Sequence, residues 1–176
     1  MLITQTPLRI SFAGGGTDLE AYYRESGGAV LSSAIDKYVY VILNKRFDDK
    51  IYISYSKKEI VDSVDEIQHE LVREALRIAG ITKGVEIAIM ADIPSSGSGL
   101  GSSSSLTVGL LNAFHAYQGV QAPAEQLARE ACEIEIARCG KPIGNPDQSI
   151  PAYAGFNFFE FRPEGPVDIT PTRPAP

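Results

Sequence analysis

A glycine-serine segment between a strand-like run and a helical stripe constrains the fold of this chain most strongly. Residues 85–90 are mostly apolar and partly β-branched, which predicts a strand, and apolar positions recur at helical spacing over 106–117. The loop between them, 92–105, has glycines at alternate positions: Gly97, Gly99 and Gly101. Such a backbone can approach an anion closely, and a helix that starts behind it directs N–H groups and partial positive charge the same way. The segment therefore predicts a phosphate-binding loop.

Three other interpretations of this loop fit the residues less well. A P-loop needs lysine followed by serine or threonine after its last glycine, whereas Ser102 and Ser103 follow Gly101 directly. A dinucleotide-binding turn needs the pattern GxGxxG, and the third glycine here comes one place early. A flexible Gly-Ser linker would not lie between a strand and a helix with an apolar stripe. The remaining interpretation is a phosphate-binding loop of another type.

The other apolar patterns predict one mixed domain of strands and helices. The chain has 176 residues, 44% of them apolar, which is enough for one core. Period-two and β-branched runs predict strands at 8–12, 29–31, 38–43, 51–55, 85–90 and 157–161. Helical spacing predicts helices at 65–79, which Gly80 ends, at 106–117 and at 123–138.

One glutamate stands on the apolar face of the last predicted helix. On a wheel at 100° per residue with Leu127 at zero, Glu135 falls at about 80°, within the arc of apolar side chains. A buried carboxylate without a partner costs several kcal/mol. We therefore predict a compensating group beside Glu135.

Two kinds of cation could compensate Glu135, and the residues alone do not choose between them. One is an arginine, for which Arg138 and Arg9 are the candidates. The other is Mg²⁺, which prefers one or two protein oxygens together with substrate phosphates. Ser102 and Ser103, at the end of the loop, would add a hydroxyl ligand in the second case.

A second carboxylate, Asp147, lies beyond the end of the same helix. Turn chemistry alone explains an aspartate in such a segment. A carboxylate held near a bound γ-phosphate would instead orient the attacking hydroxyl or accept its proton in phosphoryl transfer. The spacing from Glu135 leaves both interpretations open.

Charge and composition exclude several classes of partner. The net charge is −6 and no basic run occurs, which argues against nucleic acid. Cys132 and Cys139 lack the paired spacing of a zinc site, so we expect reduced thiols and a cytoplasmic protein. No signal segment or membrane span is evident, so we expect a soluble protein without a membrane partner. The oligomeric state is left undetermined.

At this point the motifs resemble those of a known family, the GHMP kinases, which include galactokinase, homoserine kinase, mevalonate kinase and phosphomevalonate kinase. Residues 93–105 are similar to the family's phosphate loop, and residues 6–18 resemble its first motif. The resemblance implies an α+β fold of the ribosomal protein S5 domain 2-like type, with ATP and Mg²⁺ as cofactors. It implies nucleotide contacts from Pro94, Gly97, Gly99, Leu100, Gly101, Ser102, Ser103 and Ser104.

The same resemblance implies roles for single residues. Ser103 and Glu135 correspond to Mg²⁺ ligands, and Asp147 corresponds to the catalytic acid residue near the substrate hydroxyl. Arg9 stands where the family has a lysine or arginine close to that hydroxyl. The substrate-binding positions would be Gly15, Gly16, Thr17 and Asp18.

Within the family, residues 7–19, the four serines of 102–105 and residues 143–148 look most like the bacterial D-glycero-D-manno-heptose 7-phosphate kinases. That resemblance implies ATP-dependent phosphoryl transfer to a sugar phosphate, at the anomeric hydroxyl of a heptose 7-phosphate. The alternatives are an inactive fragment that binds ATP or phosphate, and another sugar kinase of the family, galactokinase-like or fucokinase-like.

The resemblance also predicts the domain organisation. Residues 1–162 correspond to the amino-terminal, ATP-binding domain, and 163–176 form a proline-rich tail or truncated linker. The family's third motif belongs to a carboxy-terminal domain, and nothing after Phe161 resembles it. We therefore expect that this second domain is missing and that the fragment alone turns over poorly or not at all.

Overall fold

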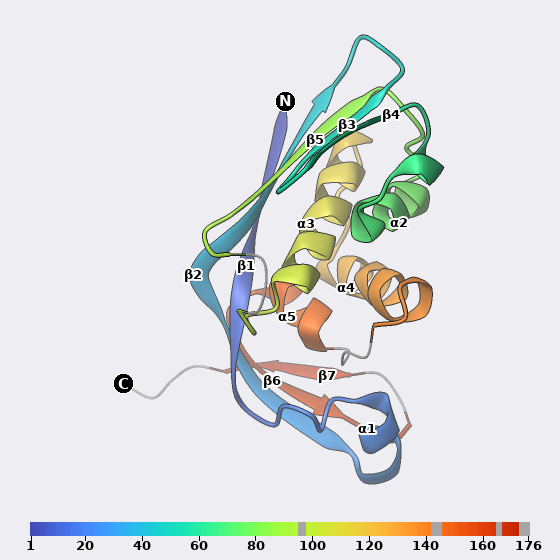
Figure 1. The fold of residues 1–176 in the computed structure, drawn as a ribbon. Coiled ribbons are helices and arrows are strands. Elements are labelled where there is room, and N and C mark those ends of the chain that lie inside the picture. The colour runs from blue at the N-terminus through green and yellow to red at the C-terminus, as the bar shows by residue number, and fades with distance from the viewer. Residues whose placement is uncertain (95–97, 142–145, 165–166, 173–176) are drawn as a thin grey trace.

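A mixed sheet with helices over one face forms the domain (Figure 1). The computed structural model describes residues 1–94, 98–141, 146–164 and 167–172. The strand order is β4-β3-β5-β2-β6-β7, with β1 paired to β2, and β3 and β5 run parallel while the other paired strands are antiparallel. The strands are β1 (Leu2–Ala13), β2 (Gly28–Lys45), β3 (Ile51–Ser54), β4 (Lys58–Val61), β5 (Val85–Ala91), β6 (Phe156–Phe161) and β7 (Asp168–Pro171).

Strand β2 runs through both halves of the sheet. Its residues 39–45 pair with β5, and its residues 28–33 pair with β6. Strand β1 pairs along both parts, with irregular register after Pro7 and again after Ser11. Pro7 has no N–H to donate, which fits its place at such an irregularity. The two half-sheets are therefore joined mainly through β1 and β2.

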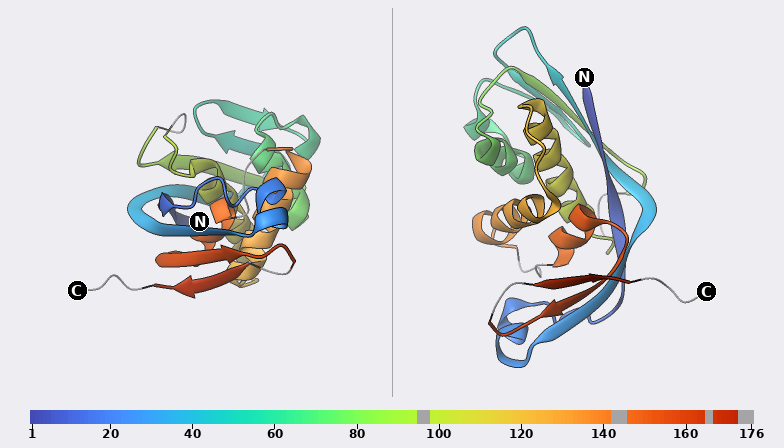
Figure 2. Two further views of the ribbon diagram at one scale, coloured as in Figure 1. Left: turned by 90° about the horizontal axis from the view of Figure 1, so that it is seen from below. Right: turned by 180° about the vertical axis from the view of Figure 1, so that it is seen from behind.

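Helix α3 lies between the sheet and the other helices that cover the same face, as the right view in Figure 2 shows. Leu110, Leu111 and Phe114 of α3 are fully buried, and they belong to one core cluster with residues of the sheet, α2 and α4. The helical segments are α1 (Glu20–Ser26), η1 (Val64–Glu66), α2 (Glu70–Ala79), α3 (Ser102–Tyr117), α4 (Ala124–Cys132), η2 (Glu133–Arg138) and α5 (Pro146–Tyr153).

Helix α3 approaches β1 closely at a glycine. The Thr4 Oγ1 hydroxyl donates a hydrogen bond of 2.9 Å to the carbonyl of Gly109. A Cβ atom at Gly109 would lie 2.8 Å from Thr6 Oγ1 and 3.5 Å from a methyl group of Val41. The missing side chain therefore lets the helix lie directly on the sheet.

A second, smaller cluster of buried residues lies at the other end of the sheet. It joins α1, the start of β2, α5 and β6, and β7 adds a partly buried isoleucine. The aromatic rings of Tyr23 and Phe161 lie 5.6 Å apart within it. Its members are Tyr23, Val30, Ile150, Phe159 and Phe161.

Most elements predicted from the sequence are present, with changed bounds. The strands predicted at 29–31 and 38–43 are one continuous strand, β2. The helix predicted over 65–79 begins at Glu70, after the short segment η1, and it ends at Gly80 as expected, with the left-handed φ of 67°. The helix predicted over 123–138 is α-helical only to Cys132, and η2 continues it as a π-helix.

Some elements were not predicted. Part of the segment expected as a linker, Asp168–Pro171, is β7 and pairs with β6. The sequence pattern also missed α1, β4 and α5. In the part of the chain that the structure describes, no helix is both long enough and apolar enough to cross a bilayer.

Candidate active site

The glycine-serine loop leads into the amino end of α3, as predicted. Gly101 precedes the helix with φ 72° and ψ 26°. This left-handed conformation is unfavourable for any residue that has a side chain. Arg9 of β1 holds this loop: its backbone N–H donates to the carbonyl of Leu100 at 3.1 Å, and its guanidinium donates to the carbonyl of Gly99 at 2.9 Å. The structure thus brings the predicted residue Arg9 onto the predicted loop.

Glu135 is buried beneath the first turn of α3. Its side chain has no exposed surface. The Ser103 hydroxyl donates to Glu135 Oε2 at 2.6 Å, and the Ser104 hydroxyl donates to the same oxygen at 3.4 Å. Glu135 is therefore buried, as its place on the apolar arc predicted, and these two donors are serine hydroxyls rather than the arginine considered from the sequence.

A π-helical turn positions Glu135. In η2 the backbone N–H of Cys139 bonds the carbonyl of Ile134, five residues earlier, and the backbone N–H of Lys141 bonds the carbonyl of Glu135. Such widened turns occur often at functional sites because they change the direction of side chains relative to an α-helix. The turn also folds Lys141 back over Glu135.

Lys141 supplies the cation beside Glu135, and the sequence analysis did not single it out. Its ammonium donates to Ser103 Oγ at 3.1 Å and lies 3.9 Å from Glu135 Oε2. Arg138, one of the two arginines proposed for this place, instead contacts Glu133 at 2.6 Å and Glu74 at 3.5 Å. The only sequence signal for Lys141 is a positive charge just after the glycine that ends the helix.

The chemistry of the site also suits a divalent cation. Among the described residues, the second carboxylate oxygen, Glu135 Oε1, is buried and has no hydrogen-bond partner. Such an atom is costly unless a donor or a metal satisfies it. Glu135 and Ser103 would supply a carboxylate and a hydroxyl oxygen, the hard ligands that Mg²⁺ prefers, and phosphates could complete the shell.

A mostly apolar hollow, here called the Leu106 slot, borders the same loop. It comprises two adjoining cavities of about 220 and 210 Å³ that share His69, Ile89, Ala91 and Leu106. Ser102 and Ser103 line the second cavity. The first is also lined by Tyr55, Ser56, Met90 and Ile93, and the second by Val39 and Leu71.

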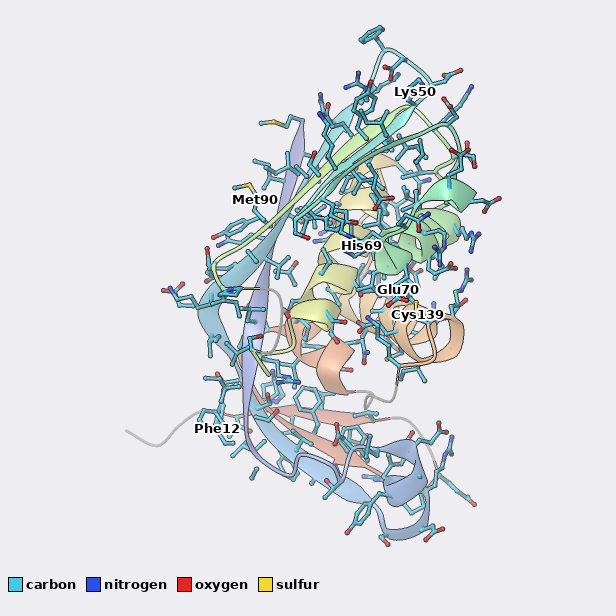
Figure 3. All side chains as sticks on the ribbon, viewed as in Figure 1. Phe12, Lys50, His69, Glu70, Met90 and Cys139 are labelled. Carbon is cyan, nitrogen blue, oxygen red and sulfur yellow. The ribbon has the colours of Figure 1, made fainter. Side chains whose placement is uncertain are left out.

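His69 forms part of the wall of this slot, and no motif or spacing in the sequence points to it. It precedes α2 (Figure 3), and its ring meets that of Tyr55 edge-on with the ring centroids 4.8 Å apart. Burial lowers the pKa of His69 below its ordinary value, and the charge of Glu59 opposes this effect only in part. A neutral imidazole in an apolar wall suits a flat, uncharged ligand group.

The predicted sugar-binding turn is held by its own hydrogen bonds. The backbone N–H of Gly16 donates to the Asp18 carboxylate at 2.7 Å, and the Thr17 hydroxyl donates to the carbonyl of Gly14 at 2.7 Å. Figure 1 shows this turn, just before α1, at the lower end of the sheet, whereas α3 begins near the middle. The described contacts do not bring Gly15, Gly16, Thr17 or Asp18 against the phosphate loop.

The remaining predicted residues can be placed only in part. Asp147 is the second residue of α5, and its side chain lies outside what the structure describes. Gly97 lies outside the described residues, while Pro94 is exposed just before the undescribed part of the loop. The structure therefore leaves the geometry between Asp147 and Glu135 as a prediction.

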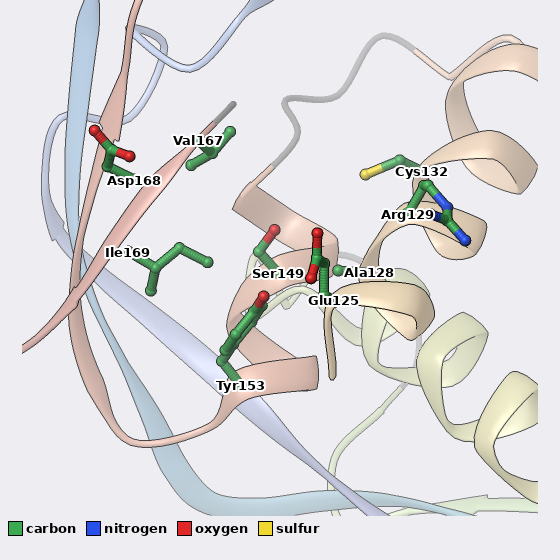
Figure 4. A pocket seen from close by; sticks show the side chains of 9 residues that line it. All are labelled: Glu125, Ala128, Arg129, Cys132, Ser149, Tyr153, Val167, Asp168 and Ile169. Atoms are coloured by element: carbon green, nitrogen blue, oxygen red, sulfur yellow. The ribbon is translucent and has the colours of Figure 1, made fainter. Parts of the chain in front are cut away.

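A larger cavity, of about 610 Å³, lies elsewhere, between α4, α5 and β7 (Figure 4). The described residues around it include Arg129, Cys132, Ser149 and Tyr153. None of the predicted site residues is among the nine that line it. Size alone does not make it the reaction site, because the buried carboxylate and the glycine loop lie at α3.

Together, an open-faced sheet, a glycine loop before a buried helix and a carboxylate beneath that helix's first turn define an α+β domain with a candidate site at the amino end of α3. Residues 63–155 match the family model described as GHMP kinases N terminal domain. The chain belongs to the GHMP kinase family, and its fold is that of the family's amino-terminal domain.

Individual relatives lie among the sugar kinases of the family. The chain is 35% identical to the D-glycero-alpha-D-manno-heptose 7-phosphate kinase of Campylobacter jejuni, over 97% of this chain and 53% of that protein. A solved D-glycero-D-manno-heptose 1-phosphate kinase from Bacteroides thetaiotaomicron superposes with a TM-score of 0.88 at 28% identity, over 98% of this chain and 60% of that one. A putative sugar kinase from Campylobacter jejuni has a TM-score of 0.83 at 33% identity, over 97% and 56% of the two chains. The chain thus spans about half the length of the relatives that it matches.

Proposed function

We propose that this chain is the ATP-binding part of a kinase that transfers the γ-phosphoryl group of ATP to a hydroxyl of a sugar phosphate. The observation that carries the proposal is the buried Glu135 carboxylate, which accepts a hydrogen bond of 2.6 Å from the Ser103 hydroxyl directly behind the glycine loop. A flexible anion-binding loop alone would not need a fully buried acid beneath it. A metal-nucleotide site does, because a carboxylate and a hydroxyl there hold the cation that accompanies the phosphates.

The position of the Leu106 slot supports a nucleotide rather than a simple phosphate. The slot has apolar walls and reaches Ser102 and Ser103, so a base in it would place the attached phosphates toward the amino end of α3. The N–H groups of the loop and helix would then bind the phosphate oxygens. Arg9 lies on the loop, and its guanidinium would add positive charge near the transferred group.

In the proposed reaction the substrate oxygen forms the new bond to the γ-phosphorus as the bond to the ADP oxygen breaks. The proton of the attacking hydroxyl passes to the carboxylate of Asp147, which also orients that hydroxyl. When bound at Ser103 and Glu135, Mg²⁺ would neutralise charge on the phosphate oxygens. The chain's own part is positioning and electrostatics, which carry most of the catalysis in phosphoryl transfer.

For the acceptor we propose a heptose 7-phosphate, phosphorylated at its anomeric hydroxyl. The support is the likeness to the Campylobacter jejuni and Bacteroides thetaiotaomicron proteins, whose names specify heptose phosphates. Gly15, Gly16, Thr17 and Asp18 are the proposed sugar contacts. Because the chain spans about half of those relatives, we propose that turnover needs a second domain.

Isothermal titration of the 176-residue chain tests the nucleotide site. We expect ATP with Mg²⁺ to bind, and we expect Ala91→Trp, which fills the Leu106 slot, to weaken that binding at least tenfold. Ile60→Trp is the control, because the Ile60 side chain is 50% exposed on β4 and lines neither cavity of the slot. Absence of heat with wild-type chain and ATP·Mg²⁺ would contradict the proposal.

Turnover of the complete gene product tests the catalytic assignment. Asp147→Asn should leave ATP affinity nearly unchanged and lower phosphoryl transfer by on the order of 10²-fold or more. Asp62→Asn, on an exposed carboxylate paired with Lys50, is the control and should change neither quantity. Unchanged turnover in Asp147→Asn would remove that residue from the mechanism.

A panel of heptose, galactose and fucose derivatives in the same assay would identify the acceptor. No ATP consumption with any of them would favour the binding-only alternative.

A further inference from the structure

Lys141 stands against the same two groups that the proposed function assigns to the divalent cation. Its ammonium nitrogen is 3.1 Å from Ser103 Oγ and 3.9 Å from Glu135 Oε2. A Mg²⁺ ion bound by those oxygens would lie about 2.1 Å from each. The ammonium and the metal ion would then be close neighbours of like charge, with little water between them to screen the repulsion.

A second acid offers the ammonium another partner. Glu70 Oε1 lies 3.6 Å from Lys141 Nζ on the outer side, and its side chain is 51% exposed whereas that of Lys141 is 25% exposed. Figure 3 shows Glu70 at the amino end of α2, facing the segment that carries Cys139. Rotation of the lysine side chain alone could therefore exchange Ser103 and Glu135 for Glu70 and solvent.

We propose that Lys141 is the built-in counter-cation of the nucleotide-free site and that loading of the metal-nucleotide displaces its ammonium from Ser103 and Glu135 toward Glu70. The inference rests on the proposed function, because it assigns the displacing cation to that site. In the empty site the ammonium compensates a carboxylate that has no exposed surface. On loading it acts as a competitor, so Lys141 and Glu70 together set the affinity for the cation.

Mn²⁺ binding at saturating ADP, followed by electron paramagnetic resonance, tests the competition directly. Lys141→Met should bind Mn²⁺ roughly tenfold more tightly than the wild-type chain, because a neighbouring positive charge is gone. Lys83→Met is the matched control, since that lysine pairs with the exposed Asp49 instead and its loss should leave the affinity unchanged. Glu70→Gln should weaken Mn²⁺ binding, and this effect should be much smaller in the Lys141→Met background.

Thermal unfolding in EDTA tests the counter-cation role without any nucleotide. Lys141→Met should lower the melting temperature by several degrees, and the loss should shrink in a Glu135→Gln background, where no buried charge needs compensation. Lys141→Arg keeps the charge and should stay close to wild type in this measurement.

Failure of this inference can be told apart from failure of the proposed function. If the wild-type chain binds Mn²⁺ and ADP, and Lys141→Met binds Mn²⁺ no more tightly than wild type, the proposed displacement is wrong. Weaker ADP binding in EDTA by Lys141→Met would overturn it as well, because Lys141 would then be a phosphate ligand. If the wild-type chain bound no ADP under either condition, the proposed function would fail and the displacement with it.

Discussion

At the scale of single residues, the lowered pKa of His69 makes stability depend on pH. Its ring packs against Tyr55 in the wall of the Leu106 slot, where the charged imidazolium is poorly solvated. The unfolded chain has no such burial, so its histidine titrates near the ordinary value of about 6.5. As the pH falls below that value, the unfolded state takes up the proton first, and the free energy of unfolding decreases.

We therefore predict that wild-type protein loses more stability than His69→Gln when the pH is lowered from about 7.5 to about 5, because only the wild type carries the buried imidazole with the lowered pKa. Urea unfolding at several pH values measures the difference. Equal pH profiles for wild type and His69→Gln would show that His69 is not responsible.

Of the two charged residues in this site, Glu135 could be predicted from the sequence and Lys141 could not. The wheel position of Glu135 was sufficient to predict a buried acid, because helical periodicity extends from its neighbours into η2. Lys141 was not predicted, because its contact with Ser103 joins residues 38 apart in the sequence. The contact also depends on a π-helical turn, which the spacing of apolar residues does not predict. Its role follows from tertiary geometry.

At the scale of elements, the packing of α3 on β1 depends on the close approach at Gly109. Alanine is ordinarily the better helix residue by about 1 kcal/mol. Here the added methyl would lie 2.8 Å from Thr6 Oγ1, which is closer than van der Waals contact allows. The helix would have to move away from the strand, and the hydrogen bond from Thr4 to the Gly109 carbonyl would lengthen.

We predict that Gly109→Ala lowers the free energy of unfolding by about 1–3 kcal/mol, the usual range for overpacking. Chemical denaturation monitored by circular dichroism measures this change. Gly15→Ala is the control: among the described residues, no atom beyond its chain neighbours lies within 4 Å of the added methyl, so its effect should stay within about 0.5 kcal/mol. A Gly109→Ala protein as stable as wild type would mean that the helix-strand contact has room to adjust.

The predictable elements were those with a long apolar period. Helix α3 and strand β5, with the loop between them, were predicted because strand and helix periodicities meet there. Helix α5 was missed because it contains Pro151, and β7 was missed because its four residues include only one large apolar side chain. Short elements of this kind are stabilised by neighbours that the local sequence does not reveal.

At the scale of the whole molecule, the two buried clusters divide the domain into regions of unequal stability. The larger cluster is built from α2, α3, α4 and the strands that these helices cover. The smaller cluster lies where α1, α5, β6 and the amino-terminal part of β2 meet. Local opening costs less free energy where fewer apolar contacts are broken.

Hydrogen-deuterium exchange at peptide resolution should therefore show faster exchange in β6 than in β5. Both strands are paired on two sides within the sheet, which makes them a matched pair. Variants that thin the small cluster, such as Phe159→Leu, should increase the difference and leave β5 unchanged. Equal protection of β5 and β6 would show that the domain opens as one unit.

The long strand β2 has a consequence for biosynthesis. Its lower part pairs Gly28 with Phe161 and Ser33 with Phe156, partners separated by most of the chain. A chain emerging from the ribosome can pair β2 with β1 and β5 and cover them with α3 long before β6 has been made. Until then, one edge of β2 has no partner, and unpaired edges of this kind promote misassembly. The amino-terminal part of β2 is therefore the last part of that strand to gain its partner during synthesis.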